Sequence, residues 1–280
     1  MTSKKNSLLC PNCRKLISRD EPQCPYCGLP NPGSWWKNNI WTRGFKQPDQ
    51  LIKAIIYLNA GMFILSILFN PGGLDISMNP LALLSPDSNS LFMLGASGTI
   101  PIMKYGRWWT LFSANFLHGS LLHILFNMMA FRQLAPLVTK EFGIYRMLTI
   151  YLLGGVAGYL VSFLAGIPFT IGASAAVCSL IGSAIYYGKR RGGAYGQAIY
   201  SQLGGWAIFI FIFGFMVPGI NNWAHGGGML TGALLGYLLG FNELKRESYF
   251  HKSLAGTCVF LCLGALAWGI ISSFLYLIFT

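Results

Sequence analysis

Residues 223–241, WAHGGGMLTGALLGYLLGF, form an apolar stretch in which a histidine precedes glycines spaced four apart, Gly228, Gly232 and Gly236. A helix of this length crosses the roughly 30 Å hydrocarbon core of a bilayer. Small residues at four-residue spacing let two membrane helices approach backbone to backbone. His225 lies three residues before Gly228 and therefore on the same helix face. The stretch predicts a tightly packed membrane helix with a histidine on its packed face.

Apolar stretches of similar length recur along the chain. Of its 280 residues, 54% are hydrophobic and 10% are charged, which is outside the usual composition of soluble domains. We therefore predict an all-α membrane protein. The first 50 residues show no cleavable signal, so we expect the first span to insert the chain. The seven predicted spans cover residues 51–69, 111–131, 147–167, 171–188, 198–217, 223–241 and 254–279.

The basic residues alternate with these spans. All 20 Lys and Arg except Lys104 and Arg107 precede or begin the first span, or fall in loops on its amino-terminal side of the membrane. Because basic loops stay cytoplasmic, we predict a cytoplasmic N terminus in a multi-pass protein of the cell (plasma) membrane. This alternation accounts for the net charge of +12. A nucleic-acid partner is not expected, because it would require a basic folded surface with interleaved aromatic residues.

Residues 1–33 contain four cysteines in two CxxC knuckles. Each knuckle can direct two sulfur atoms at one ion, which predicts a small ribbon with a structural zinc site. Zinc would hold together a segment too short to form a core, whereas a disulfide is disfavoured in the reducing cytoplasm. Residues 34–50, rich in Trp and basic side chains, predict a linker at the inner membrane interface. The predicted zinc ligands are Cys10, Cys13, Cys24 and Cys27.

Polar side chains cluster near the start of three predicted spans. The second span begins FLHGSLLHILFN and contains His118, His123 and Asn127. Polar groups at membrane depth are costly, and they usually face the protein interior or a water-filled cavity. A lone membrane histidine most often has a packing role. With the N terminus inside, however, the starts of the second, fourth and sixth spans lie at one depth, which places His123, Ser174 and His225 together toward the outer side.

Ser174 and His225 have the chemistry of a nucleophile and its base. A triad would also need an acid to orient the base, but none of the eight Asp and Glu residues lies inside a predicted span. We therefore predict a Ser–His dyad, in which His225 takes the proton of Ser174 and returns it to the leaving amine. We expect His123, Asn127 and the backbone N–H of Ser174 to stabilise the oxyanion. This chemistry requires no cofactor.

These residues resemble the rhomboid intramembrane serine proteases in three motifs. HGSLLHILFN is similar to the family's HxxxxHxxxN, Gly172-Ala173-Ser174 is similar to its GxS nucleophile motif, and AHGGG followed by Gly232 is similar to its AHxxGxxxG. The resemblance covers residues 51–241 and the seventh span. It implies a bundle of six core transmembrane helices plus one C-terminal helix.

The resemblance also implies residue roles. Ser174 would be the nucleophile, His225 the base, His123 and Asn127 the oxyanion partners, and His118 a structural residue. Gly172, Gly228 and Gly232 would support the site. Residues 51–280 would then form a transmembrane protease domain in the lipid bilayer. Its substrates would be transmembrane proteins, cut in a cavity that opens to the outer side, while the partner of the ribbon is not indicated.

Three positions depart from the family pattern. Ala175 stands where GxSG has its last glycine, Cys178 where an aromatic residue usually packs against the base, and Thr110 where GxWWR has its arginine. None of them removes a reacting group, so we expect activity with an altered rate or preference. Residues 95–98, GASG, fit GxSG literally but lie in the first loop, and we predict that Ser97 serves loop packing.

Two other functions are compatible with parts of the pattern. The chain could be a catalytically weak or silent rhomboid-like protein that binds membrane clients. Such proteins generally lose the serine or the histidine, whereas this chain keeps both. A transporter would show internal repeats and polar residues near the bilayer centre. Neither is apparent here, because the polar residues gather toward the outer third.

Overall fold

The computed structural model describes residues 7–11, 13, 15–34, 48–69 and 83–279. It divides into two compact units, Met1–Leu51 and Ile52–Thr280. Most of the predicted interfacial linker lies outside the described residues, as does the first part of the loop that follows the first span. We describe the two units separately.

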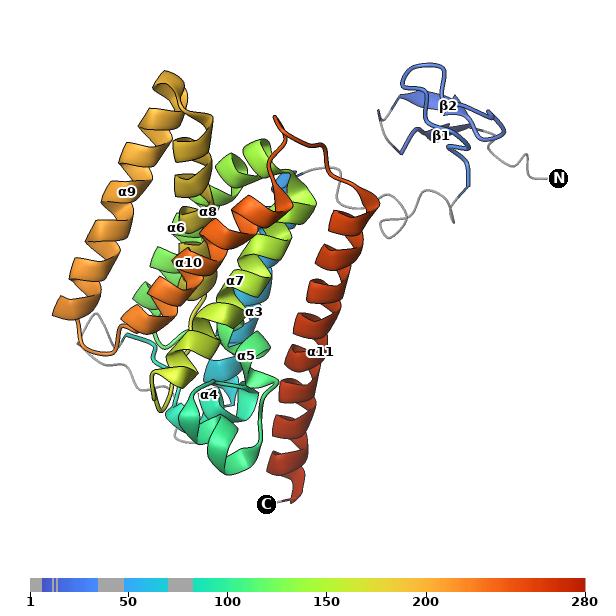
Figure 1. The fold of residues 1–280 in the computed structure, drawn as a ribbon. Helices are drawn as coiled ribbons and strands as arrows, with labels where there is room; N and C mark the ends of the chain where they lie inside the picture. The colour runs from blue at the N-terminus through green and yellow to red at the C-terminus, as the bar shows by residue number, and fades with distance from the viewer. Residues whose placement is uncertain (1–6, 12, 14, 35–47, 70–82, 280) are drawn as a thin grey trace. The chain divides into compact units, whose positions relative to one another are not determined.

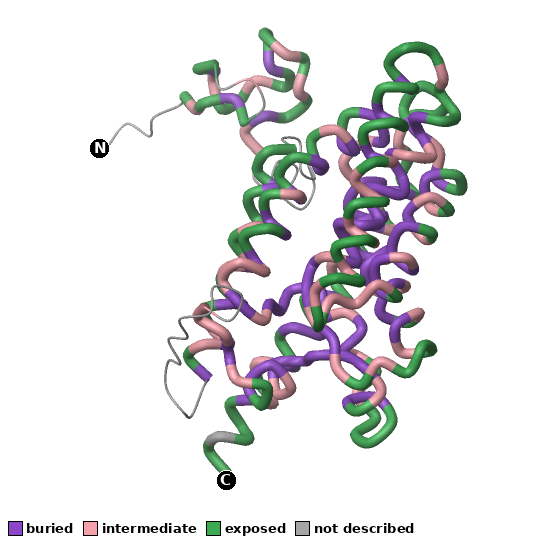
Figure 2. The backbone as a smooth tube through the Cα atoms, turned by 90° about the vertical axis from the view of Figure 1, so that its left-hand side faces the viewer, coloured by how far each residue is buried: buried purple, intermediate pink, exposed green. Residues whose placement is uncertain are grey.

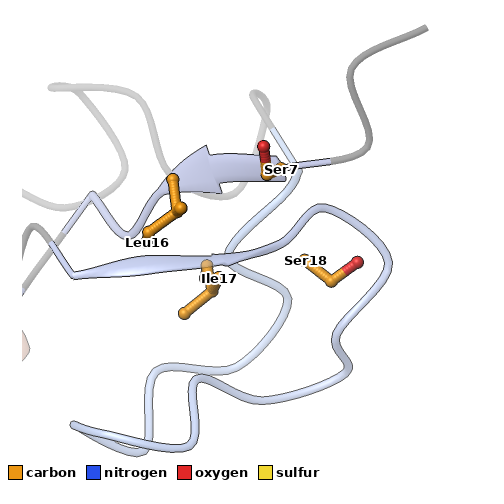
Figure 3. Close-up of a pocket in the computed structure, with 4 residues that line it drawn as sticks. All are labelled: Ser7, Leu16, Ile17 and Ser18. Atoms are coloured by element: carbon orange, nitrogen blue, oxygen red, sulfur yellow. The ribbon is translucent and has the colours of Figure 1, made fainter. Parts of the chain in front are cut away.

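The first unit contains an antiparallel hairpin of β1 (Ser7–Leu9) and β2 (Leu16–Ser18). Its small core consists of Cys10, Ile17 and Cys24. So little buried apolar surface cannot by itself offset the entropy of ordering the segment, and a metal usually makes up the difference. Figure 3 shows the open depression along the hairpin. It offers no charged side chain to a ligand, because it is lined by Ser7, Leu16, Ile17 and Ser18.

The second unit is a helical bundle (Figure 1). Its described residues include seven helices of 18 residues or more. Short helical segments connect the first two of them, namely α4 (Ser88–Leu94), the π-helix η2 (Ile100–Lys104), α5 (Thr110–Ser113) and the 3₁₀ helix η3 (Ala114–Phe116). The long helices are α3 (Pro48–Leu68), α6 (Leu121–Phe142), α7 (Ile144–Leu164), α8 (Ser174–Arg191), α9 (Gly193–Met216), α10 (Asn222–Leu239) and α11 (Tyr249–Phe279).

The predicted class, an all-α membrane protein, is confirmed. Five of the described helices, α3, α6, α7, α9 and α11, are long and apolar enough to cross a membrane. The other two long helices, α8 and α10, were also predicted as spans. Their length and composition alone do not identify them as helices that could cross a membrane. Both are rich in Gly, Ala and Ser and are packed by other helices. A helix surrounded by protein needs less apolar surface than one that faces lipid.

The predicted start of the second span is wrong by ten residues. We predicted a helix over 111–131, whereas α6 begins at Leu121. Ser120 has an extended backbone, and its hydroxyl accepts a hydrogen bond from the N–H of His123, which makes it the N-cap. The apolar residues before it are buried by protein contacts, as Leu117 illustrates. His118 therefore lies in the loop before the helix and not on it.

Backbone contact between α8 and α10 confirms the packing that the glycines predicted. A Cβ on Gly228 would overlap the carbonyl oxygen of Ala175, and one on Gly232 would overlap that of Ser179. A Cβ on Gly182 would likewise overlap the carbonyl oxygen of Met229. On α8, the residues that face these glycines are thus Ala175 and Ser179.

Burial differs among the long helices. Of the 18 most apolar consecutive residues, 61% are buried in α7 and 11% in α9. Figure 1 shows α9 and α11 at opposite edges of the bundle, and Figure 2 shows the buried stretches gathered inside it. The outer helices therefore present apolar side chains to lipid, while α7, α8 and α10 form the protein core.

Candidate active site

Two helix starts bring the predicted nucleophile and base together. Ser174 is the first residue of α8, and His225 lies in the first turn of α10. The distance between Oγ of Ser174 and Nε2 of His225 is 2.9 Å, which is a hydrogen bond. His225 is buried and Ser174 is partly exposed. The pair thus combines a protected base with a reachable hydroxyl.

No acid orients the predicted base, His225, among the residues that the structure describes. When Nε2 of a neutral imidazole accepts the proton of a serine, its own proton is on Nδ1. Nδ1 of His225 is buried and has no hydrogen-bond partner among the described residues. Cys178, the residue at the usually aromatic position, is also buried on α8. Within the described part of the chain, the orientation of His225 therefore depends on the placement of α10 and not on a third side chain.

Residues 165–173 connect α7 to Ser174, and we call them the nucleophile loop after the predicted role of Ser174. Gly172 determines the shape of this loop. Its φ is +121°, a conformation that favours glycine. A Cβ at this position would lie 2.7 Å from Nε2 of His123, which is too close for any other residue. The N–H of Gly172 donates to the carbonyl of Ala114 at 2.9 Å, and its own carbonyl accepts a hydrogen bond from the hydroxyl of Tyr159. The backbone just before Ser174 is therefore held on both sides.

His123 presents an N–H to this loop. Its Nδ1 accepts a hydrogen bond from the N–H of Gly119 at 3.3 Å, so the neutral ring has its proton on Nε2. That nitrogen lies beside Gly172, two residues before the nucleophile. A preorganised N–H donor next to a reacting serine is what an oxyanion requires.

Asn127 and His118 occupy supporting positions. The side-chain amide of Asn127 donates to the carbonyl of His123 at 3.0 Å, which leaves its second N–H uncommitted. Nε2 of His118 accepts from the N–H of Ala173 at 3.5 Å, and its ring contacts that of His123 edge to face. His118 is thus placed to hold the residue before the nucleophile.

The four predicted metal ligands also come together, in the first unit. Their sulfur atoms all lie within 4.8 Å of one another. The Cys10–Cys27 and Cys13–Cys24 sulfur distances are both 3.7 Å. The N–H of Lys15 lowers the pKa of the Cys13 thiol, but burial and the three neighbouring thiols outweigh it and raise that pKa to about 11. Four crowded thiols of this kind fit a single cation that would replace their protons.

Comparison with known proteins assigns the helices that carry Ser174 and His225 to a family. Residues 105–242 match the rhomboid domain. The chain carries a domain of the rhomboid family. This domain includes α6 to α10 and with them both residues of the Ser–His pair.

Curated relatives agree with this assignment. RHOMBOID-like protein 4 of Arabidopsis thaliana is 33% identical over 164 residues, which are 58% of this chain and 41% of that protein. Rhomboid protease GluP of Bacillus subtilis is 28% identical over 188 residues, 66% of this chain and 36% of that protein. Rhomboid-like protease 5 of Toxoplasma gondii is 31% identical over 167 residues, 57% and 19% respectively. The chain spans between 19% and 57% of the length of these and the other curated relatives considered.

The first departure from the rhomboid pattern, Ala175, has a structural counterpart. Ala175 is buried against α7, where Gly158 has no side chain. A Cβ on Gly158 would lie 2.9 Å from Cβ of Ala175 and 2.6 Å from the carbonyl oxygen of Ala224. The glycine of α7 therefore makes the space that the methyl group of Ala175 fills.

The third departure, Thr110, lies three residues after Arg107 and contacts it. Thr110 donates to the carbonyl of Arg107 at 2.7 Å and is buried at the start of α5. Arg107 donates to the carbonyls of Phe92 and Met93 at 2.7 and 2.9 Å, and its guanidinium stacks on the rings of Phe92 and Trp109. Carbonyls near a helix C terminus lack partners within the helix. Arg107 satisfies two of them at the end of α4.

Ser97 has the loop-packing position that we predicted for it. It is fully buried, its backbone pairs with Thr170 in both directions, and its hydroxyl oxygen lies 3.3 Å from that of Thr110. The serine of the literal GxSG match therefore forms an isolated β-bridge. This pairing ties the first loop to the loop that carries the nucleophile.

Two residues that position the site were missed in the sequence. Tyr159 resembles an ordinary aromatic filler of an apolar span, and only its hydroxyl contact with Gly172 shows its role. Asn221 looks like a loop residue before α10. Its place just before an apolar run, typical of an N-cap, was the one available signal.

Proposed function

We propose that the chain is an intramembrane serine endopeptidase, which hydrolyses peptide bonds in or near transmembrane segments of membrane proteins. The observation that carries the proposal is the 2.9 Å contact between Ser174 Oγ and His225 Nε2. Two further features support it: the N–H of His123 beside Gly172, and relatives that are themselves named proteases.

The mechanism follows from the dyad. His225 Nε2 takes the hydroxyl proton as Oγ of Ser174 forms a bond to the scissile carbonyl carbon. The tetrahedral intermediate collapses when His225 passes that proton to the leaving amine, which breaks the C–N bond and leaves an acyl ester on Ser174. Water then loses a proton to His225, attacks the ester and releases the new carboxyl terminus. The proton on His225 returns to Oγ, so the site is regenerated.

The oxyanion of each tetrahedral intermediate needs donors. The Nε2–H of His123, the second amide N–H of Asn127 and the backbone N–H of Ser174 are the candidates from this chain. Each donor is worth about 3 to 4 kcal/mol in soluble proteases. The first N–H groups of a helix have no partner within it, which makes the start of α8 suitable for this purpose.

The domain assignment and location belong to the same proposal. Residues 1–33 would be a cytoplasmic zinc ribbon, 34–50 an interfacial linker and 51–280 the transmembrane protease domain. The chain would lie in the plasma membrane. The distribution of Lys and Arg supports a cytoplasmic N terminus, with the site open to the outer side. The substrates would be transmembrane proteins that enter from the lipid bilayer.

One observation favours the alternative, a catalytically weak or silent protein that binds membrane clients. The unpartnered Nδ1 of His225 leaves the base without the stabilisation that an acid gives in a triad. Weak turnover with tight client binding would support this alternative.

The activity is tested with the purified chain in proteoliposomes that contain a transmembrane reporter. We expect cleavage by the wild type and none above background by Ser174→Ala or His225→Ala. Cleavage that survives Ser174→Ala would refute the assignment. Client binding by the wild type without any cleavage would establish the silent alternative.

We also propose that the four cysteines bind one structural zinc ion. A tetrahedron with Zn–S bonds of about 2.3 Å has edges of about 3.8 Å, close to the observed 3.7 Å between paired sulfurs. Metal analysis of the purified chain should find one zinc per chain, and Cys10→Ser combined with Cys27→Ser should abolish it. A wild-type chain without zinc would contradict the proposal.

A further inference from the structure

Asn221 joins three parts of the rhomboid domain through a single side chain. As the N-cap of α10, its Oδ1 accepts a hydrogen bond from the N–H of Ala224 at 3.1 Å. Its Nδ2 donates to Ser162 Oγ on α7 at 2.6 Å and to Thr170 Oγ1 in the nucleophile loop at 2.9 Å. Both amide protons and the amide oxygen are therefore used, and each bond reaches a different element.

Asn221 and Thr170 lie equally far along the chain from the two reacting residues. Asn221 precedes His225 by four residues, and Thr170 precedes Ser174 by four residues. The carbonyl of Asn221 also accepts the N–H of His225 at 3.1 Å. Thr170 is itself fixed by its two backbone hydrogen bonds with Ser97, at 2.8 and 3.0 Å. The Asn221–Thr170 bond thus connects the backbone that leads to the base with the backbone that leads to the nucleophile.

This connection matters because no side chain among the described residues holds the imidazole of His225 at Nδ1. In a triad an acid holds the imidazole, whereas Nδ1 of His225 has no partner among the described residues. The position of the imidazole then depends on the position of the first turn of α10. A displacement of about 1 Å at a reacting group can reduce the rate about a hundredfold.

We propose that Asn221 is a positioning residue. Its hydrogen bonds from the start of α10 to Ser162 and Thr170 hold the base in place next to the nucleophile. The inference rests on the proposed protease function. Asn221 contacts no reacting atom and acts through the backbone of α10.

The test separates the two roles of Asn221, which are to cap α10 and to hydrogen-bond it to Ser162 and Thr170. Asn221→Ser keeps a good N-cap, but its side chain is too short to reach Ser162 and Thr170. Thr170→Val removes the acceptor while it keeps the shape. We expect each variant to lower kcat about tenfold or more, with KM within about twofold and unchanged thermal stability in detergent. The double variant should be no slower than the slower single variant, because both remove one connection.

Asn242 provides a matched control beyond the opposite end of α10. Its side chain also joins neighbouring helices, because Nδ2 donates to the carbonyl of Lys140 at 3.0 Å. We expect Asn242→Ser to leave kcat within about twofold of the wild type, since Asn242 does not contact the nucleophile loop. A similar loss of kcat in Asn242→Ser would show a general packing effect and overturn the inference.

The failure of this inference can be told apart from failure of the protease proposal. If the wild type neither cleaves the reporter nor reacts with a fluorophosphonate probe at Ser174, the protease proposal fails and the inference fails with it. If the wild type cleaves and Asn221→Ser retains its kcat, the inference alone is refuted. A loss of kcat that parallels a loss of thermal stability would also refute it, because that is the signature of capping alone.

Discussion

Gly158→Ala tests the packing that holds the dyad. Gly158 lies on α7 against both partner helices, next to the residue that follows the nucleophile and the residue that precedes the base. A new Cβ would lie 2.6 Å from the carbonyl oxygen of Ala224 and 2.9 Å from Cβ of Ala175. Non-bonded heavy atoms prefer separations of about 3.5 to 4.0 Å. The helices must therefore move apart by about 1 Å.

The expected cost follows from that movement. The Ser174–His225 distance of 2.9 Å would exceed the length of a useful hydrogen bond if α8 and α10 moved independently. We expect kcat to fall about a hundredfold, and stability to fall by about 1 to 3 kcal/mol, as for other overpacked cores. Ala175→Gly in the same chain should recover part of both losses, because it relieves only one of the two contacts.

Reporter cleavage in proteoliposomes and unfolding in detergent measure these effects. Gly226→Ala is the matched control, since its Cβ would meet only the ring of Phe211, at an ordinary 3.4 Å. It should cleave the reporter within about twofold of the wild type. The reasoning would be wrong if Gly158→Ala were as active as this control, or if Ala175→Gly failed to improve Gly158→Ala.

Three further variants probe single features of the site. Arg107→Lys should destabilise the protein by about 1 to 2 kcal/mol, because lysine cannot bond two carbonyls and stack at once; detergent unfolding no different from wild type would contradict this. Ser97→Ala should cleave the reporter within about twofold of the wild type, and loss of cleavage without loss of stability would show that Ser97 is more than a packing residue. Gly172→Ala should reduce kcat about a hundredfold, since its φ of +121° and the imidazole of His123 both exclude a side chain; kcat close to wild type would refute this account of the loop.

The features that the sequence predicts well are those with a strong pattern. Long apolar stretches predict helices, glycines at fixed spacing predict the tight packing of α10, and paired CxxC knuckles predict a cysteine cluster. The acid inventory predicts that the base has no carboxylate partner. Each of these inferences depends on residues close together in the chain or on composition.

The features that the sequence does not reveal depend on contacts between distant residues. The apolar residues before α6 are buried by protein and not by lipid, so hydropathy placed the start of the helix too early. Tyr159 and Asn221 have ordinary surroundings in the sequence, and their roles come from hydrogen bonds to the nucleophile loop. Arg107 was one of two exceptions to the charge alternation, and the structure supplies the reason in the carbonyls of α4.

The central claim is that Ser174 is a nucleophile activated by His225. Its most direct test is to treat the membrane-embedded chain with a fluorophosphonate and to map the covalent adduct by mass spectrometry. We predict one adduct, on Ser174, which disappears in His225→Ala although that variant remains folded. An adduct on Ser97 in place of Ser174, or labelling of Ser174 that does not depend on His225, would contradict the account.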